Sequence, residues 1–398
     1  MVSSWSVRTF KGMIWIICVA GMTQGLLIPL LTMFLEERGV QADFNGLSAS
    51  ALYLGILIAA PLGPAMVRRI GVKKSILTGL SVVTIAACFF PFFHGFWAWT
   101  GLRFLVGVGD SLLHYATQLW ITIHAPKKER GRRISQYGFA YGLGFGIGPL
   151  GLNLVQFGDV VPFLFILCIL AVSFYLTIRL TIVESLESEL NEPEAKKQGS
   201  LRTIYRLGFI GFCSPFIYGF LETALTGNFP VIGMREGIDQ GFISLLISAF
   251  VWGSLLFQVP LGVLGDRIGR KNLLLLVCSI GSVGMFIIPF FLSNVLYLFL
   301  AFILIGGFVG SLFSMGLACA TDLLPARFLP AANAIASVHF SIGSILGPSL
   351  GGFLIEKAGG KMLFISIGWM LACYVLIILL EKMTNRLHPF KSKEKQAV

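Results

Sequence analysis

The chain has 398 residues, of which 56% are hydrophobic and only 12% are charged. A soluble fold cannot bury that much apolar surface, so the composition excludes a soluble globular protein and indicates a protein of the lipid bilayer. The formal net charge of +11 is also compatible with a nucleic-acid partner until the positions of the charges are considered.

Apolar segments follow one another along almost the whole chain. A helix needs roughly 20 apolar residues to cross about 30 Å of hydrocarbon. Twelve segments reach that length, which predicts an all-α polytopic membrane protein with both termini on one side. The predicted spans are 12–35, 43–67, 75–94, 97–122, 133–157, 161–183, 203–233, 241–264, 272–292, 295–322, 330–356 and 362–382.

Lysine and arginine are distributed unevenly between the two sides of these spans. On the side of the termini lie 25 of the 30 basic residues, whereas the opposite loops hold only Arg38, Arg235, Lys357 and Lys361. Because flanking positive charge resists translocation, we expect both termini in the cytoplasm and the chain in the plasma membrane. Topology then accounts for the net charge, and we expect no nucleic-acid partner.

The fourth span carries a polar stripe. Arg103, Gly107, Asp110 and His114 stand at i, i+4, i+7 and i+11, which places them on one helical face. A charge at the bilayer centre costs roughly 2.5–3.5 kcal/mol, so such residues face a cavity or a partner. We predict a coupling or substrate role for Arg103, Asp110 and His114, with Asp110 as one candidate counter-ion of Arg103. A static ion pair that orients the helix is the alternative.

A polar segment separates two halves of the chain. Residues 184–202 contain five glutamates, a proline and several basic residues, and no apolar run. They predict a cytoplasmic linker between a six-helix bundle at 1–183 and a second bundle with a short tail at 203–398. The seven cysteines lie singly inside predicted spans without metal-ligand spacing, so we expect no metal and no cofactor.

The seventh span contains the preferred functional acid, Glu222. Tyr218, Glu222 and Thr226 share one helical face, and alignment of the two halves places Gln24 of the first span at the position equivalent to Glu222. A carboxyl group removed from water holds its proton more tightly and can exchange it near neutrality. Glu222 is therefore predicted to carry protons or to attract a cationic substrate. An interhelical hydrogen bond is the alternative.

A short charged turn follows the eighth span and has a degraded copy in the first half. At an offset of 198, Arg69 aligns with Arg267 and Lys73 with Lys271, but Arg68 stands where the second half has Asp266. We expect this turn and Asp322, near the cytoplasmic end of the tenth span, to form a cytoplasmic latch. Its predicted residues are Gly262, Asp266, Arg267, Gly269, Arg270 and Lys271.

The fifth and eleventh spans share a glycine-proline pattern that is complete only in the eleventh. Small residues four apart allow close helix packing, and proline removes one backbone hydrogen bond, so these spans could bend. Ordinary tight packing is an equal alternative. His339, also in the eleventh span, could titrate or act as an interhelical donor. The predicted hinge residues are Gly148, Pro149, Gly343, Gly347, Pro348, Gly351 and Gly352.

With two similar halves and these motifs, the chain resembles the major facilitator superfamily over nearly its whole length. Residues 262–271 reproduce the family's signature Gly-x-x-x-Asp-Arg-x-Gly-Arg-Lys, residues 103–109 are similar to its R-x-x-x-G-x-G motif, and residues 343–352 are similar to its antiporter motif. The resemblance implies alternating access, a cytoplasmic latch, a proton-coupling role for Arg103 and a monomeric state.

The function predicted from these features is proton-coupled efflux of a small amphipathic drug or metabolite. The first span lacks an acidic residue, so uptake by symport or uniport stays open. A sensor or scaffold that keeps the carrier fold is a further alternative. No motif of a membrane enzyme is present in the sequence, and we expect no enzymatic activity.

Overall fold

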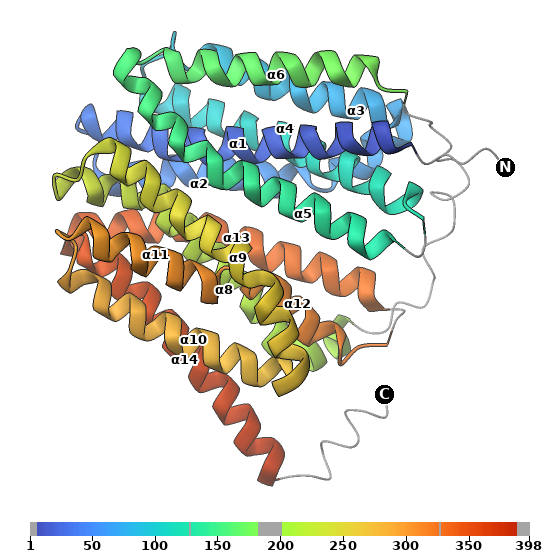
Figure 1. The fold of residues 1–398 in the computed structure, drawn as a ribbon, viewed down its shortest axis with the longest axis vertical. Coiled ribbons are helices and arrows are strands. Elements are labelled where there is room, and N and C mark those ends of the chain that lie inside the picture. The colour runs from blue at the N-terminus through green and yellow to red at the C-terminus, as the bar shows by residue number, and fades with distance from the viewer. Residues whose placement is uncertain (1–5, 127–128, 182–200, 326–327, 388–398) are drawn as a thin grey trace. The chain divides into compact units, whose positions relative to one another are not determined.

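The fold is described from a computed structural model, which covers residues 6–126, 129–181, 201–325 and 328–387. Within these ranges all regular secondary structure is helical (Figure 1). The helices are α1 (Val7–Glu37), α2 (Ala42–Ala59), α3 (Leu62–Phe89), α4 (Phe96–His124), α5 (Arg130–Ile147), η1 (Gly148–Phe157), α6 (Val161–Arg179), α8 (Leu201–Arg235), α9 (Gln240–Ile268), α10 (Arg270–Ile287), η2 (Ile288–Phe290), α11 (Val295–Val309), α12 (Leu312–Thr321), α13 (Leu329–Ala358) and α14 (Lys361–Leu387).

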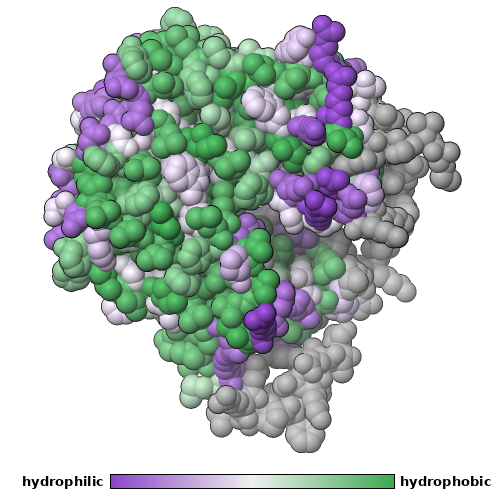
Figure 2. Space-filling view, in the orientation of Figure 1, coloured by the Kyte–Doolittle hydropathy of each residue, from purple (hydrophilic) through white to green (hydrophobic). Residues whose placement is uncertain are grey.

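The helices agree with an all-α membrane protein. Among the described residues, eleven segments are long and apolar enough to cross a membrane, with η1 continuing α5 and α12 continuing α11. The remaining predicted span, 97–122, is α4, whose polar stripe lowers its hydropathy. Figure 2 shows apolar side chains covering most of the described surface in that view. Such a surface is stable only in contact with lipid or with another apolar surface.

The turn after the second predicted span differs from the expectation. The sequence predicts one span over 43–67, but α2 ends at Ala59 and α3 begins at Leu62, because Pro61 cannot donate a backbone hydrogen bond. The helix α3 then contains the charged turn and bends at Gly71, whose φ of 83° disfavours any residue with a side chain. Gly269, between α9 and α10, has a φ of 87°. The aligned turns therefore share one backbone geometry.

By its contacts the chain divides into two units. Unit 1 is Met1–Glu194 with Thr226–Ser248, and unit 2 is Ala195–Leu225 with Ala249–Val398. The end of α8 and the start of α9 thus group with unit 1, where Arg235 Nε lies 2.7 Å from Glu36 Oε1 and Asn153 donates a hydrogen bond to Ser244 Oγ at 3.2 Å. The predicted linker lies almost wholly outside the described residues, so the division at 184–202 stays a prediction.

Glycines allow close helix contacts inside each unit. In unit 1 a Cβ on Gly144 would lie 1.9 Å from the Cys18 carbonyl oxygen, and one on Gly107 would lie 1.9 Å from the Leu52 carbonyl oxygen. These contacts bring α5 against α1 and α4 against α2 (Figure 1). In unit 2 a Cβ on Gly343 would lie 2.1 Å from the Phe216 carbonyl oxygen, which brings α13 against α8.

Candidate functional site

Three helices of unit 1 bring polar side chains together in its interior. Gln24 of α1 donates a hydrogen bond to the Oδ2 atom of Asp110 on α4, and Tyr141 of α5 donates to Gln24 Oε1 at 3.1 Å. Gln24 is 2% exposed and Asp110 is 1% exposed. The second carboxyl oxygen of Asp110 is buried without a hydrogen-bond partner among the described residues. Asp110 is therefore a buried carboxyl group held by a neutral amide.

His114 extends this network toward the C-terminal end of α4. Its Nδ1 atom lies 3.0 Å from the hydroxyl of Tyr137, which in turn lies 3.3 Å from Thr117 Oγ1. The ring of His114 also meets that of Tyr141 edge-on, with centroids 4.7 Å apart. Because Tyr141 also donates a hydrogen bond to Gln24, one continuous series of contacts leads from Asp110 through Gln24, Tyr141, His114 and Tyr137 to Thr117. The sequence placed Asp110, His114 and Gln24 among the site residues but gave no signal for Tyr137 or Tyr141.

Arg103 does not pair with Asp110, so the proposed counter-ion relationship is wrong. Its Nη2 atom lies 3.5 Å from the Ile28 carbonyl oxygen and 3.4 Å from Thr32 Oγ1, and Nη1 has no hydrogen-bond partner among the described residues. Asp110 lies two helical turns, about 10 Å, further along α4, whereas the Arg103 guanidinium is directed at α1. Arg103 is a second, separate buried charge in unit 1 and is 2% exposed.

In unit 2 the polar centre is on α8. Tyr218 donates a hydrogen bond of 2.7 Å to Glu222 Oε1, as the i, i+4 spacing predicts. The ring of Tyr218 stacks on Phe340 of α13, with centroids 6.0 Å apart, which fixes the tyrosine beside the carboxyl group. Thr226, one turn further along α8, is 1% exposed and groups with unit 1.

His339 lies in a different part of unit 2 from Glu222. Its Nδ1 atom is 2.8 Å from the Ile335 carbonyl oxygen, so Nδ1 donates, and its Nε2 atom is 3.1 Å from the hydroxyl of Tyr205. The second contact ties α13 to α8.

The predicted latch residues lie close together in unit 2. Arg270 Nη2 is 2.6 Å from Asp266 Oδ1, and Arg270 Nε is 3.5 Å from Asp322 Oδ2 on the far end of α12. Both carboxylates are largely exposed, so each pair is individually weak. Arg267 is exposed at the end of α9. A Cβ on Gly262 would have no atom within 4 Å, so packing in unit 2 does not require that glycine.

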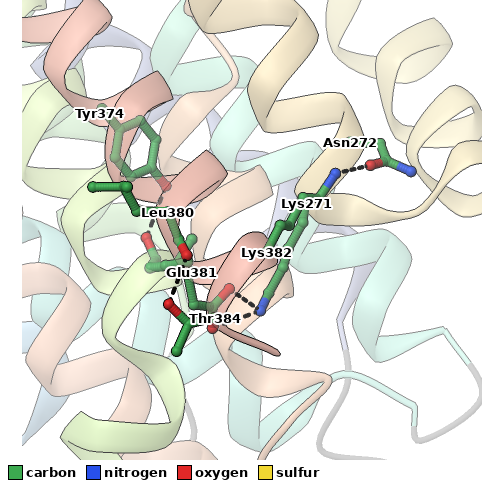
Figure 3. A network of polar contacts seen from close by, with 8 residues as sticks. Lys271, Asn272, Tyr374, Leu380, Glu381, Lys382 and Thr384 are labelled. Carbon is green, nitrogen blue, oxygen red and sulfur yellow. Dashed lines mark hydrogen bonds and ion pairs between the residues drawn. The ribbon is translucent and has the colours of Figure 1, made fainter. Parts of the chain in front are cut away.

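Lys271 adds a partner that the sequence analysis missed. Its Nζ atom lies 2.6 Å and 2.9 Å from the two carboxylate oxygens of Glu381 on α14 (Figure 3). In unit 1 the aligned Lys73 donates to the Ile178 and Leu180 carbonyl oxygens at 2.8 Å and 2.9 Å, at the end of α6. The internal repeat was the signal that pointed to α14 as the partner helix of Lys271, because α6 and α14 occupy equivalent positions in the two halves.

The glycine-proline patterns take different forms in the two units. In unit 1 the α-helix α5 gives way to the 3₁₀ helix η1 at Gly148, followed by Pro149. In unit 2 α13 runs through Pro348 without interruption. A Cβ on Gly347 would lie 2.4 Å from the Phe220 carbonyl oxygen, and Gly351 and Gly352 are buried. These glycines allow tight packing, and the described residues hold no group of three His, Cys, Asp or Glu side chains that could bind a metal ion.

Comparison with known proteins agrees with the internal duplication. A model of the Major Facilitator Superfamily matches residues 13–211 and again residues 207–397. The chain is 37% identical over 378 residues to a Bacillus subtilis (strain 168) protein named "Uncharacterized MFS-type transporter YfkF", a match that covers 93% of this chain and 94% of the relative. It is 24% identical over 359 residues to the "Uncharacterized MFS-type transporter YcaD" of Escherichia coli O7:K1 (strain IAI39 / ExPEC), covering 89% and 91%. The chain therefore belongs to the Major Facilitator Superfamily and is a membrane transporter.

Proposed function

We propose that this transporter works by alternating access and couples the export of a small amphipathic drug or metabolite to proton entry. It acts as a monomer in the plasma membrane with both termini in the cytoplasm. The proposed direction follows from the resemblance of residues 343–352 to the family's antiporter motif. The proposed orientation follows from the 25 basic residues on the side of the termini.

The observation that carries the coupling is the buried carboxyl group of Asp110. An ionised carboxylate in a low-dielectric interior is costly unless a cation or several hydrogen bonds compensate it. Gln24 supplies one neutral donor, and the other carboxyl oxygen has no partner among the described residues. Such a group must bind a proton, or a cationic substrate, whenever water leaves it. Exchange between the two is the event that antiport requires.

Glu222 offers a second exchange point in unit 2. Its carboxyl group also accepts a hydrogen bond from a neutral donor, the hydroxyl of Tyr218. One proton moving through about 100 mV supplies roughly 2.3 kcal/mol. At about 1.4 kcal/mol per decade, this holds a concentration ratio of several tens. A single titrating carboxyl group is therefore sufficient for useful export.

The test is proton movement in proteoliposomes that hold an imposed proton gradient and an internal pH-sensitive dye. Lipophilic cations, weak bases, neutral amphiphiles and anionic metabolites are added in turn. Wild type is compared with Asp110→Asn and Glu222→Gln, and Glu236→Gln, an exposed acid in the loop after α8, is the matched control. We expect at least one compound to dissipate the gradient through wild type and the control, but not through one or both of the other variants.

Three results contradict the proposal. If labelled compound moves through wild type while the internal pH stays constant, transport is not proton-coupled. If both buried-acid variants couple as well as wild type, the carboxyl groups have a structural role. Flux that occurs only down the proton gradient in the same direction as the proton would identify a symporter.

A further inference from the structure

Unit 2 contains a cavity of about 730 Å³ near the start of α8. Arg202, Tyr205 and Arg206 of α8 form one wall, and Ile335, Val338 and His339 of α13 form the other. All of these residues belong to unit 2. The cavity is distinct from the Tyr218–Glu222 pair, which lies at least three turns further along α8. Neither the coupling proposal nor the latch uses it.

Two exposed arginines carry the positive charge at this cavity. Arg202 and Arg206 stand at i, i+4 on α8, a spacing at which like charges repel. Both are also in the first two turns of the helix, where the backbone dipole presents its positive end. Neither arginine forms an ion pair with any part of the chain that the structure describes. A bound anion would offset the repulsion between the two arginines. It would also offset the repulsion between each arginine and the positive end of the helix dipole.

The other side of the cavity is apolar. Ile335 and Val338 line it from α13, and Val338 is 45% exposed. The hydrogen bond from Tyr205 to His339 ties the two walls together, so the polar groups between them are already satisfied. A ligand that suits this lining has one compact anionic group and a hydrocarbon segment. Arginine favours phosphate in such a site because its planar guanidinium donates two parallel hydrogen bonds.

We infer that this cavity binds the phosphate group of an anionic phospholipid, with Arg202 and Arg206 on the phosphate and an acyl chain along Ile335 and Val338. The start of α8 follows the predicted cytoplasmic linker, so the lipid belongs to the cytoplasmic leaflet. That leaflet assignment rests on the orientation proposed above. Basic pockets between helices on this side of a membrane suit anionic headgroups. A soluble phosphate compound shares the anionic chemistry but not the acyl chain.

The test is binding of phosphatidylglycerol to the purified full-length protein, measured by native mass spectrometry against phosphatidylcholine of the same chain length. We expect the apparent affinity for phosphatidylglycerol to fall about tenfold or more in the double variant Arg202→Gln/Arg206→Gln, because two charge-assisted contacts are lost. The matched control is Arg8→Gln/Lys11→Gln. It removes the same charge from exposed residues at the start of α1, the equivalent helix of the first half.

A second pair of measurements separates the lipid from a soluble anion. Val338→Trp fills the apolar wall and keeps both arginines, so we expect it to weaken phosphatidylglycerol binding severalfold. Inorganic phosphate at millimolar concentration should compete poorly with the lipid. If inorganic phosphate displaces the lipid fully, or if Val338→Trp binds it as wild type does, the ligand is a free anion and the lipid inference is wrong. If both double variants lose binding equally, the attraction is a general surface effect and the site does not exist.

Discussion

Tyr218 Oη lies 2.7 Å from Glu222 Oε1, one turn away on the same helix, so the hydroxyl donates to the carboxyl group within α8 itself. A hydrogen bond to a carboxyl group contributes roughly 0.5–3 kcal/mol, depending on its charge. The tyrosine ring is itself held by Phe340. The carboxyl group is therefore oriented before a substrate arrives.

Tyr218→Phe should reduce transport without unfolding the protein, because the ring still stacks on Phe340 while the hydroxyl is lost. The loss of one hydrogen bond predicts a reduction of about threefold to tenfold in the initial rate. The measurement is initial flux of the compound identified in proteoliposomes. Tyr175→Phe, whose side chain is 58% exposed on α6, serves as control and should transport as wild type does. A normal rate for Tyr218→Phe would exclude the tyrosine from the site.

Gln24→Leu should destabilise unit 1, because it leaves Asp110 buried with neither carboxyl oxygen bonded. Leaving a buried polar group without its partner costs about 1–3 kcal/mol. The measurement is the midpoint of thermal unfolding in detergent, which should fall by several degrees. The double variant Gln24→Leu/Asp110→Leu should recover part of the loss, since the buried carboxyl group is then removed and only the hydroxyl of Tyr141 loses its hydrogen bond to Gln24. If the double variant is less stable than the single one, Asp110 has another partner.

The backbone contact at Gly343 predicts a steric effect. A Cβ there would lie 2.1 Å from the Phe216 carbonyl oxygen, so Gly343→Ala must push α13 away from α8. Overpacking of this kind costs roughly 1–3 kcal/mol. We expect lower thermal stability and reduced transport. Gly95→Ala is the control, because a Cβ at Gly95 would meet nothing within 4 Å and its φ of −86° suits alanine. Equal stability of the two variants would contradict the packing shown here.

The pair between Lys271 and Glu381 should be detectable by a double-mutant cycle. Both side chains are partly buried, with exposed fractions of 27% and 30%. Lys271→Glu places two carboxylates together and should destabilise the protein, whereas Lys271→Glu/Glu381→Lys should restore part of the loss. We expect a coupling free energy of about 1 kcal/mol. Additive effects of the two exchanges would show that the ions do not interact in the membrane.

The fold could be predicted from the sequence because the membrane constrains hydropathy and charge distribution along the chain, and the internal repeat shows that the two halves share one plan. The length and apolarity of a segment identify it as a membrane span, whichever helices it packs against. Gly71 and Gly269 align in the two halves, and both turns have a positive φ at the glycine. Contacts along one helix, such as Tyr218 with Glu222, were equally predictable, since the i, i+4 spacing alone brings those side chains together.

Contacts between helices could not be predicted in the same way. Asp110 pairs with Gln24 rather than Arg103 because α1 crosses α4 at that level, and helical periodicity says nothing about which neighbour is present. The partner Glu381 of Lys271 lies 110 residues away in the chain. A stripe of polar residues indicates which face of a helix avoids lipid. The partner and the burial of each polar residue depend on how the neighbouring helices pack.

The paired turns at Gly71 and Gly269 separate backbone shape from charge. Both turns have a positive φ that only glycine adopts easily, but Arg68 stands in one turn where Asp266 stands in the other. The same bend therefore accommodates either sign of charge. The ion pairs of Arg270 have no counterpart in the first turn, because Val72 stands at the aligned position.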